Sequence, residues 1–248
     1  MKRSFEKQYH ESEKKHFWFK SRRNYIIELL KNSPKNSKIL DIGCSSGILL
    51  SELVEIGFDI TNLYGIDISN YAIDNCKKNG LYNVFVMNAQ NISIDNTFDF
   101  IIASDCLEHI KNDKNAIKNW YQLLNPGGSI FIFVPAFNML WSEHDIVNMH
   151  FKRYTKKELV KILKDNSFEI VKSSYWNFLL FVPVFLLRAA NKLYTFKNKK
   201  NKGDLIEPKL FNNLLLTIIN IENKMLKYIN FPFGISTFCI AKRPLKLL

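Results

Sequence analysis

A short stretch in the middle of the sequence holds side chains that can move protons or bind ions. His144 and Asp145 are followed within nine residues by His150, Arg153 and Tyr154. An imidazole accepts protons near neutral pH, and a neighbouring carboxylate can orient its ring. We interpret His144 or His150 as a general base, with Asp145 as its orienting partner. Arg153 could hold an anionic group of a substrate.

Two other roles remain open for this stretch. Its side chains could simply connect a loop to the rest of the fold. Alternatively, His144, Asp145 and His150 could bind a metal ion as three ligands. Of these roles we prefer the general base, and we predict no metal site.

A second group of residues combines a carboxylate with a glycine turn. Residues 39–50 (ILDIGCSSGILL) read as a strand, a tight turn and the start of a helix. Gly43 and Gly47 give the turn the freedom to bring its backbone close to a ligand. A dinucleotide-binding protein would carry GxGxxG here, with a pyrophosphate at the helix N-terminus. Asp41 would repel a pyrophosphate, and it suits a cationic ligand such as an amino-acid ammonium group.

Another carboxylate ends the next predicted strand. Asp67 follows Asp41 by 26 residues, which is the length of one β-α-β unit. A carboxylate at the tip of that strand can accept hydrogen bonds from both hydroxyl groups of a ribose. The two acids together favour a ligand that carries a positive charge and a ribose.

The elements that must position these residues alternate between short apolar runs and amphipathic segments, which predicts a parallel sheet with helices on both faces. A helical stretch over 5–30 precedes the first strand. We predict strands at 38–42, 62–66, 83–87, 98–103, 128–134, 168–175 and 235–242, and core helices at 47–56, 69–79, 112–124 and 156–166.

The chain divides into three parts on this reading. Residues 1–36 form an N-terminal helical lid, and residues 37–176 with 235–248 form an α/β core. Residues 177–234 hold two apolar segments joined by a lysine-rich loop, which we interpret as a helical insertion before the last strand. All three parts belong to a single domain.

Composition limits the choice of partners and compartment. The net charge of +12 comes from 29 lysines and only six arginines among 248 residues, as an AT-rich genome would produce without selection for a partner. Only local clusters of charge therefore count as evidence. The four cysteines form no CxxC pair, and residues 1–15 are too charged for a secretory signal. We expect a cytoplasmic protein that is soluble or peripheral to the membrane.

Four motifs occur in a fixed order: DIGCSSG (41–47), GIDIS (65–69), CLEHI (106–110) and NPGGSIFI (125–132). With these motifs the chain resembles the class I S-adenosylmethionine-dependent methyltransferase superfamily over roughly residues 15–175. The resemblance implies a Rossmann-like, doubly wound sheet of seven strands, mostly parallel, with an antiparallel last strand. It also implies S-adenosylmethionine as the cofactor.

The resemblance assigns cofactor contacts to the matching positions. The methionine part would be bordered by Asp41, Gly43, Cys44 and Gly47, the ribose and adenine by Asp67 and Ile68, the adenine amine by Asn88 and Ala89, and the sulfonium by Ser104. Two positions depart from the family pattern, because Ser45 replaces a usual glycine and Asn88 a usual aspartate.

The N-terminal segment is similar to a helix that covers the cofactor in some relatives. In that case Arg22 or Arg23 could pair with the cofactor carboxylate. Equally, the helix could be amphipathic and pack the aromatic residues 17–19 against the core.

Further resemblances concern the acceptor. The Asn/Asp-Pro-Pro-Tyr/Phe tetrad of enzymes that methylate nucleobase amines is missing after the strand at 98–103. The Leu-Glu-His segment that ends at His109 resembles O-methyltransferases of quinone biosynthesis, which adds His109 to the catalytic candidates. The loop over 134–155 is similar to one in bacterial and archaeal methyltransferases of surface-glycan or lipid biosynthesis. We expect O-methylation of a small-molecule, glycan or lipid-linked acceptor.

The predicted insertion combines lysines with an apolar run. From residue 170 to 203 there is no acidic residue, while seven are basic, and the apolar run over 178–187 is too short to span a bilayer. This pattern over 176–202 is typical of contact with an anionic membrane, although a dimer or substrate-cap helix would also explain it. An RNA-binding methyltransferase and a non-catalytic cofactor-binding partner are the alternative functions. Nucleic acid is not expected, because no RNA-binding motif is recognised.

Overall fold

The centre of the computed structural model is one sheet of seven strands, in the order β3-β2-β1-β4-β5-β7-β6. The structure describes residues 10–195 and 211–245, with only the backbone described from 189 to 195. Strand β7 is antiparallel to both of its neighbours, and the other strand pairs are parallel. The strands are β1 (Ile39–Ile42), β2 (Leu63–Asp67), β3 (Val84–Val86), β4 (Phe98–Ser104), β5 (Leu124–Pro135), β6 (Glu169–Trp176) and β7 (Ser236–Lys242). The predicted sheet, with its antiparallel last strand, is confirmed.

The register of the parallel strands brings the expected ligand-binding residues to one edge. Ile42 of β1 is aligned with Ile66 of β2 and with Ala103 of β4. Asp67 follows Ile66 in β2, and Ser104 follows Ala103 in β4, so Asp67 and Ser104 both lie level with the turn after β1. Ligands of open α/β sheets bind at this carboxyl edge.

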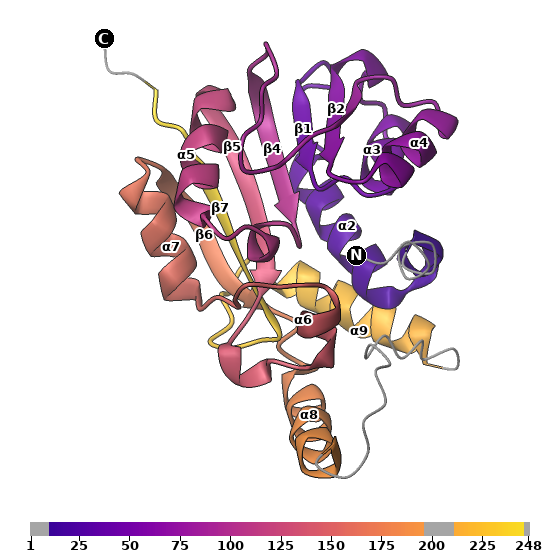
Figure 1. The fold of residues 1–248 in the computed structure, drawn as a ribbon, viewed down its shortest axis with the longest axis vertical. Coiled ribbons are helices and arrows are strands. Elements are labelled where there is room, and N and C mark those ends of the chain that lie inside the picture. The colour runs from indigo at the N-terminus through magenta and orange to yellow at the C-terminus, as the bar shows by residue number, and fades with distance from the viewer. Residues whose placement is uncertain (1–9, 196–210, 246–248) are drawn as a thin grey trace.

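Helices cover both faces of the sheet, and each face has its own buried cluster. Buried residues of α2, α3, α4 and α9 pack in one cluster, and those of α5 and α7 pack in the other. Figure 1 shows α5 and α7 together at one side of the molecule. Bounds are α2 (Phe17–Leu30), α3 (Ile48–Glu55), α4 (Asn70–Lys78), α5 (Asp113–Leu123), α6 (Glu143–Val147), α7 (Lys156–Asp165), α8 (Phe181–Thr195) and α9 (Asn212–Met225).

The predicted single helix over 5–30 is wrong in one respect, because it is broken at His16. A first helical stretch covers residues 10–15, and α2 begins at Phe17. The Nδ1 atom of His16 accepts a hydrogen bond from the backbone of Trp18 at 3.3 Å. This side-chain cap satisfies an otherwise free N–H at the start of α2. The residues before the break therefore follow a different direction from α2.

The segment before the last strand contains two helices, α8 and α9. Helix α9 packs beside α2, where Asn212 accepts from the backbone of Phe17 and Asn223 donates to the backbone of Ser21. Helix α8 extends away from the sheet beyond the end of β5 (Figure 1). None of the helices in the described ranges is both long and apolar enough to cross a membrane. The lysine cluster predicted at 197–202, the first nine residues of the predicted lid and residues 246–248 lie outside the described residues.

Candidate active site

A cavity of about 1220 Å³ lies at the carboxyl edge of the sheet. Its walls come from the turn after β1, the tips of β2 and β4, the N-terminal segment, the loop after β5, and helices α8 and α9. It therefore joins the region expected to bind the cofactor with the region expected to hold the catalytic histidines. Of the predicted site residues, Gly47 and Asp145 do not line it.

The turn after β1 depends on glycine at two positions. Gly43 and Gly47 adopt φ values of 77° and 76°, in the left-handed region that favours glycine. A Cβ atom at Gly47 would lie 2.4 Å from a methyl group of Leu81 and 2.9 Å from the sulfur of Cys76. The backbone N–H groups of Gly43 and Cys44 both donate to the carbonyl of Ile66. Gly47 thus shapes the turn from behind the cavity wall.

Two acids face the cavity from neighbouring strands. Asp41 is only 4% exposed, and its carboxyl group has no hydrogen-bond partner among the described residues. Burial, with smaller contributions from the nearby Glu13 and Asp67, raises the pKa of Asp41 to about 8. Asp67 accepts hydrogen bonds from the backbone N–H groups of Ser45 and Ser69, at 3.1 and 2.9 Å. The carboxyl group of Asp41 is therefore available to a cationic ligand, whereas two backbone N–H groups already orient the carboxylate of Asp67.

A third acid, Glu13, was not among the sequence predictions. It belongs to the helical stretch before His16, and it lines the same cavity. Its Oε2 atom accepts hydrogen bonds from the hydroxyl groups of Ser45 and Ser46, at 2.8 and 3.2 Å. Ser45 is a position where the family usually has glycine, and this departure could have directed attention to a polar partner. Burial raises the pKa of Glu13 to about 7, although the two serine hydroxyls oppose the shift.

The residues expected near the adenine lie beyond Asp67. Ile68 is 74% exposed and lines the cavity, as do Asn88 and Ala89 after β3. The side-chain oxygen of Asn88 accepts from the backbone of Gln90 at 2.8 Å, and the carbonyl of Ala89 accepts from the Trp120 indole at 2.8 Å. These bonds fix the loop after β3 beside the exposed Ile68.

Arg22 reaches the cavity from α2. Its guanidinium forms an ion pair with Asp105 and hydrogen-bonds to the hydroxyls of Ser104 and Ser236, at 3.4 and 3.3 Å. The rings of Trp18 and Trp176 lie 5.4 and 4.8 Å from its central carbon. The buried Nε atom of Arg22 has no hydrogen-bond partner in the part of the chain that the structure describes. Arg23 instead pairs with Glu52 at 2.9 Å, so Arg22 is the arginine whose guanidinium reaches the hydroxyls at the ends of β4 and β7.

The loop after β5 contains a hydrogen-bonded group centred on Asp145. The short helix α6, which the sequence analysis did not predict, places this carboxylate where it is fully buried. It accepts from Nδ1 of His150 at 2.9 Å, from Nε and Nη2 of Arg153 at 2.8 and 2.9 Å, and from the backbone of Ser142 at 2.8 Å. Burial raises the pKa of Asp145, but the hydrogen bonds from His150 and Arg153 outweigh it and hold the pKa well below its usual range.

Arg153 is fully engaged inside the protein. Besides its two bonds to Asp145, its Nη1 atom donates to the carbonyl of Ala136 at 3.1 Å. The residue is 3% exposed. Because its guanidinium is bonded to Asp145 and Ala136, Arg153 is better placed to orient Asp145 than to hold an anionic group of a substrate, the role expected from the sequence.

Two further histidines line the cavity beside His150. The ring of His109 lies 4.6 Å from that of His150, and the ring of His144 lies 6.0 Å from it. Burial lowers the pKa of both His109 and His144 to about 4, with His150 as the next contributor in each case. Both are neutral at neutral pH. Asn148 contacts Nε2 of His144 at 3.2 Å.

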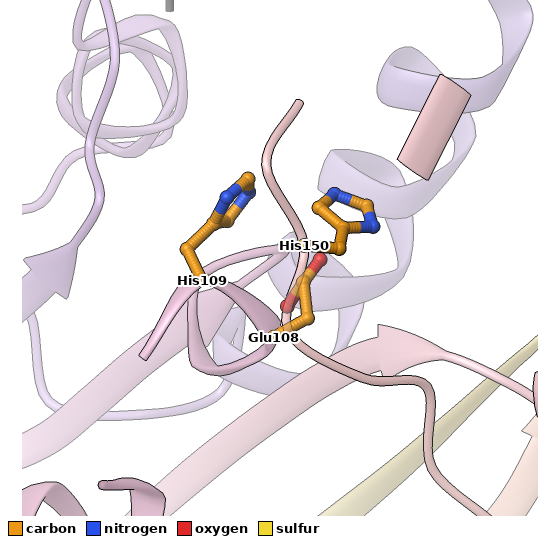
Figure 2. A group of neighbouring side chains, drawn as sticks. All are labelled: Glu108, His109 and His150. Atoms are coloured by element: carbon orange, nitrogen blue, oxygen red, sulfur yellow. The ribbon is translucent and has the colours of Figure 1, made fainter. Parts of the chain in front are cut away.

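Glu108 is a second acid that the sequence predictions missed, although it stands inside the Leu-Glu-His motif. It is 1% exposed, and within the described ranges neither of its carboxyl oxygens has a hydrogen-bond partner. Burial raises the pKa of Glu108 well above its usual value, and Asp105 adds to the shift. Glu108 and His109 come from one short helix, and His150 from a separate loop (Figure 2). Ligand atoms of the three residues lie within 4.8 Å of one another, so they could hold a metal ion.

The cavity has the chemistry that S-adenosylmethionine requires. Asp41 offers an unpaired buried carboxyl group to a cation, and Asp67 offers oriented oxygens to a ribose. Arg22 offers a positive charge to a carboxylate, and Ile68 offers apolar surface to a base. Together with the strand order and the antiparallel β7, this site defines the class I S-adenosylmethionine-dependent methyltransferases.

The comparison with protein families agrees with this class. A family model described as a methyltransferase domain matches residues 13–173, and the chain belongs to that family. Its solved structural neighbours include a S-adenosylmethionine-dependent methyltransferase from Archaeoglobus fulgidus, with a TM-score of 0.58, 21% identity, and coverage of 95% of this chain and 99% of that one. Another is the N-methyltransferase NodS from Bradyrhizobium japonicum in complex with S-adenosylhomocysteine, with a TM-score of 0.55, 14% identity, and coverage of 91% and 87%.

Curated relatives carry a narrower name. The ubiquinone biosynthesis O-methyltransferase of Nitrosococcus oceani is 31% identical over 42% of this chain and 47% of its own length. The protein of the same name from Rickettsia prowazekii is 28% identical over 59% of this chain and 65% of its own length. The chain spans about half the length of the first of these relatives and less than two thirds of the second.

Proposed function

We propose that this protein transfers the methyl group of S-adenosylmethionine to an oxygen atom of an acceptor that has a large apolar part. In this proposal His150 takes the proton of the acceptor hydroxyl. The observation that carries it is the hydrogen bond from Nδ1 of His150 to Asp145, in the wall of the cavity that also contains the cofactor residues.

The environment of His150 supports its role as a base. Because Asp145 accepts from Nδ1, the lone pair of the ring lies on Nε2, where it is free to accept a proton. Asp145 stays ionised over the working pH range, since the hydrogen bonds from His150 and Arg153 keep its pKa low. The negative charge stabilises the imidazolium that forms after proton transfer. Arg153 acts through Asp145 as a positioning residue.

The cofactor supplies an electrophilic methyl carbon on a sulfonium, which is transferred by in-line displacement. The contribution of the chain is alignment and proton removal. Asp41, Asp67 and Arg22 position the amino-acid and ribose parts, so that the acceptor oxygen must approach from the side of His150. The neutral His109 and His144 enclose that side and exclude bulk water from it.

Apolar side chains of the cavity wall support a lipophilic acceptor. Leu180 and helix α8 residues Val184 and Leu187 line the cavity, as does Leu215 of α9. On its outer face α8 exposes Val182 and Leu186, at 55% and 60%. We therefore propose a lipid-linked acceptor, rather than a free glycan, that reaches the cavity along α8 from the inner face of a membrane. The acid-free sequence over 170–203 would favour an anionic membrane.

The test is transfer of a tritiated methyl group from S-adenosylmethionine to extracts of the host cell. We expect label in the organic-solvent fraction, in an ether bond that survives mild alkali. Label that appears only in RNA, or only in an alkali-labile ester, would contradict the proposal. Loss of turnover on chelation, with recovery on addition of zinc or magnesium, would instead favour a metal site formed by Glu108, His109 and His150, and a nitrogen of His150 bound to a metal could not accept a proton.

A further inference from the structure

Glu13 contacts the turn after β1 at Ser45, a position where the family pattern described above usually has glycine. The contact depends on Ser45 and Ser46, whose hydroxyl groups donate to Oε2 of Glu13. A glycine at position 45 would have no side chain to make this bond. The serine pair therefore matches a carboxylate that the N-terminal segment brings from another part of the chain.

The position of Glu13 leaves part of its carboxylate available. Its other oxygen, Oε1, receives no hydrogen bond from the described residues. Its backbone carbonyl accepts from Nη1 of Arg23 at 2.9 Å, while Nε of Arg23 is bound to Glu52. The main chain of Glu13 is thus fixed, and one oxygen remains for a ligand in the cavity that it lines.

The surroundings of Glu13 are short of positive charge. Asp67 and Asp41 are the acids that face it across the turn, and Arg23 is the nearby cation, already paired with Glu52. Asp41 is buried without any hydrogen-bond partner for its carboxyl group among the described residues. Two incompletely satisfied carboxyl groups in one cavity wall form a site for a small cation that donates several hydrogen bonds.

We propose that Glu13 is a cofactor-binding residue, which together with Asp41 holds the ammonium group of the methionine part of the cofactor. An ammonium group has three N–H donors and can bond to both carboxylates at once. The serines at 45 and 46 support this role, because their hydroxyl groups orient the Glu13 carboxylate.

The proposal predicts that ligand binding releases protons. Burial raises the pKa of Glu13 to about 7 and that of Asp41 to about 8, so at pH 7 both groups are partly protonated without ligand. A bound ammonium favours the ionised form of each. Each protonated carboxyl group then becomes a carboxylate and releases one proton to the buffer. The affinity for an ammonium-bearing ligand should increase between pH 6 and pH 8.

Calorimetry with S-adenosylhomocysteine tests the proposal without turnover. Titrations in two buffers with different ionisation enthalpies give the number of protons released, which we expect to lie between about 0.5 and 1.5 at pH 7. The comparison ligand is the desamino analogue, which lacks the ammonium but keeps the carboxylate, sulfur and nucleoside. For it, we expect release close to zero.

The variant Glu13→Gln separates ammonium binding from a purely structural contact, because glutamine keeps the shape and can still accept from the serines. We expect affinity for S-adenosylhomocysteine at pH 8 to fall about tenfold, and affinity for the desamino analogue to stay the same. Glu11→Gln, at an exposed position two residues away, removes the same charge and should change neither. Equal weakening of both ligands by Glu13→Gln, or no weakening of either, would overturn the proposal. So would proton release of wild-type protein that is the same for the two ligands.

Discussion

Nδ1 of His150 lies 2.9 Å from Oδ1 of Asp145, and the same oxygen accepts from Arg153. The imidazole is therefore tied to an ion pair that is buried on all sides. Its orientation does not depend on the acceptor being present, which means that the base is preorganised for the transfer step.

Replacement of His150 by asparagine should lower kcat by about 10²- to 10³-fold, because the general base is lost. The affinity for S-adenosylhomocysteine, measured by calorimetry, should stay within about twofold, since His150 lies on the acceptor side. Asp145→Asn should also lower kcat, because the imidazolium that forms on His150 loses its negatively charged partner. His144→Asn, which alters only the wall around the acceptor in this proposal, should lower kcat by less than His150→Asn. Equal losses in the His144 and His150 variants would count against the assignment.

The stability of the ligand-free protein should fall as pH rises from 6.5 to 8. Glu13 and Asp41 have raised pKa values, so the folded state holds more protons than the unfolded state over this range, and stability decreases with pH. The lowered pKa values of His109 and His144 act in the opposite direction, but their effect declines through this range because the imidazoles of the unfolded chain lose their protons above about 6.5.

Thermal unfolding in low salt should show Tm falling by roughly 5 °C across this window. In Asp41→Asn the decline should be smaller, because one of the titrating groups is gone. Saturating cofactor should raise Tm more at pH 8 than at pH 6.5. A Tm that rises from pH 6.5 to 8 would show that the two acids are ionised without ligand.

Alanine at Gly47 should destabilise the protein more than alanine at Gly57. Both glycines have positive φ values, of 76° and 96°, so both substitutions strain the backbone. At Gly47 the new Cβ would meet other atoms, at 2.4 Å from Leu81 and 2.9 Å from Cys76, whereas at Gly57 no atom of the described residues lies within 4 Å. Urea unfolding should give a difference of about 1–3 kcal/mol between the two variants. Equal losses would mean that Leu81 moves aside without cost.

Membrane contact should depend on the outer face of α8. Aspartates at Val182 and Leu186 should abolish flotation with vesicles that contain anionic lipid, because they place charge on the exposed apolar surface. Aspartates at Asn213 and Thr217, exposed positions on α9, add the same charge elsewhere and should leave flotation unchanged. Failure of the wild-type protein to float at low salt would remove membrane contact from the proposed function.

The sheet and the first ligand-binding turn could be predicted because they depend on local signals. Asp41, Gly43 and Asp67 stand at the ends of apolar runs, and the carboxyl ends of parallel strands share one edge. Their position is therefore fixed once the strands are recognised.

The rest of the site depends on tertiary contacts that the sequence does not show. Glu13 reaches the cavity because the chain changes direction at His16, which one continuous helical pattern conceals. Arg153 turns inward because α6 buries its partner Asp145. A helix of five residues is too short to show a helical pattern in the sequence. Glu108 could not be predicted as a site residue, because its place beside His109 and His150 depends on how the loop after β5 folds back.

The placement of β7 between β5 and β6 has a consequence for how the chain acquires its fold during synthesis. Among the described strands, β6 pairs only with β7. It can therefore join the sheet only after β7, some sixty residues later in the sequence, has left the ribosome. Helix α9, which packs beside α2, is also made late. The emerging polypeptide must therefore keep a half-built apolar sheet from aggregating until its final strand is available.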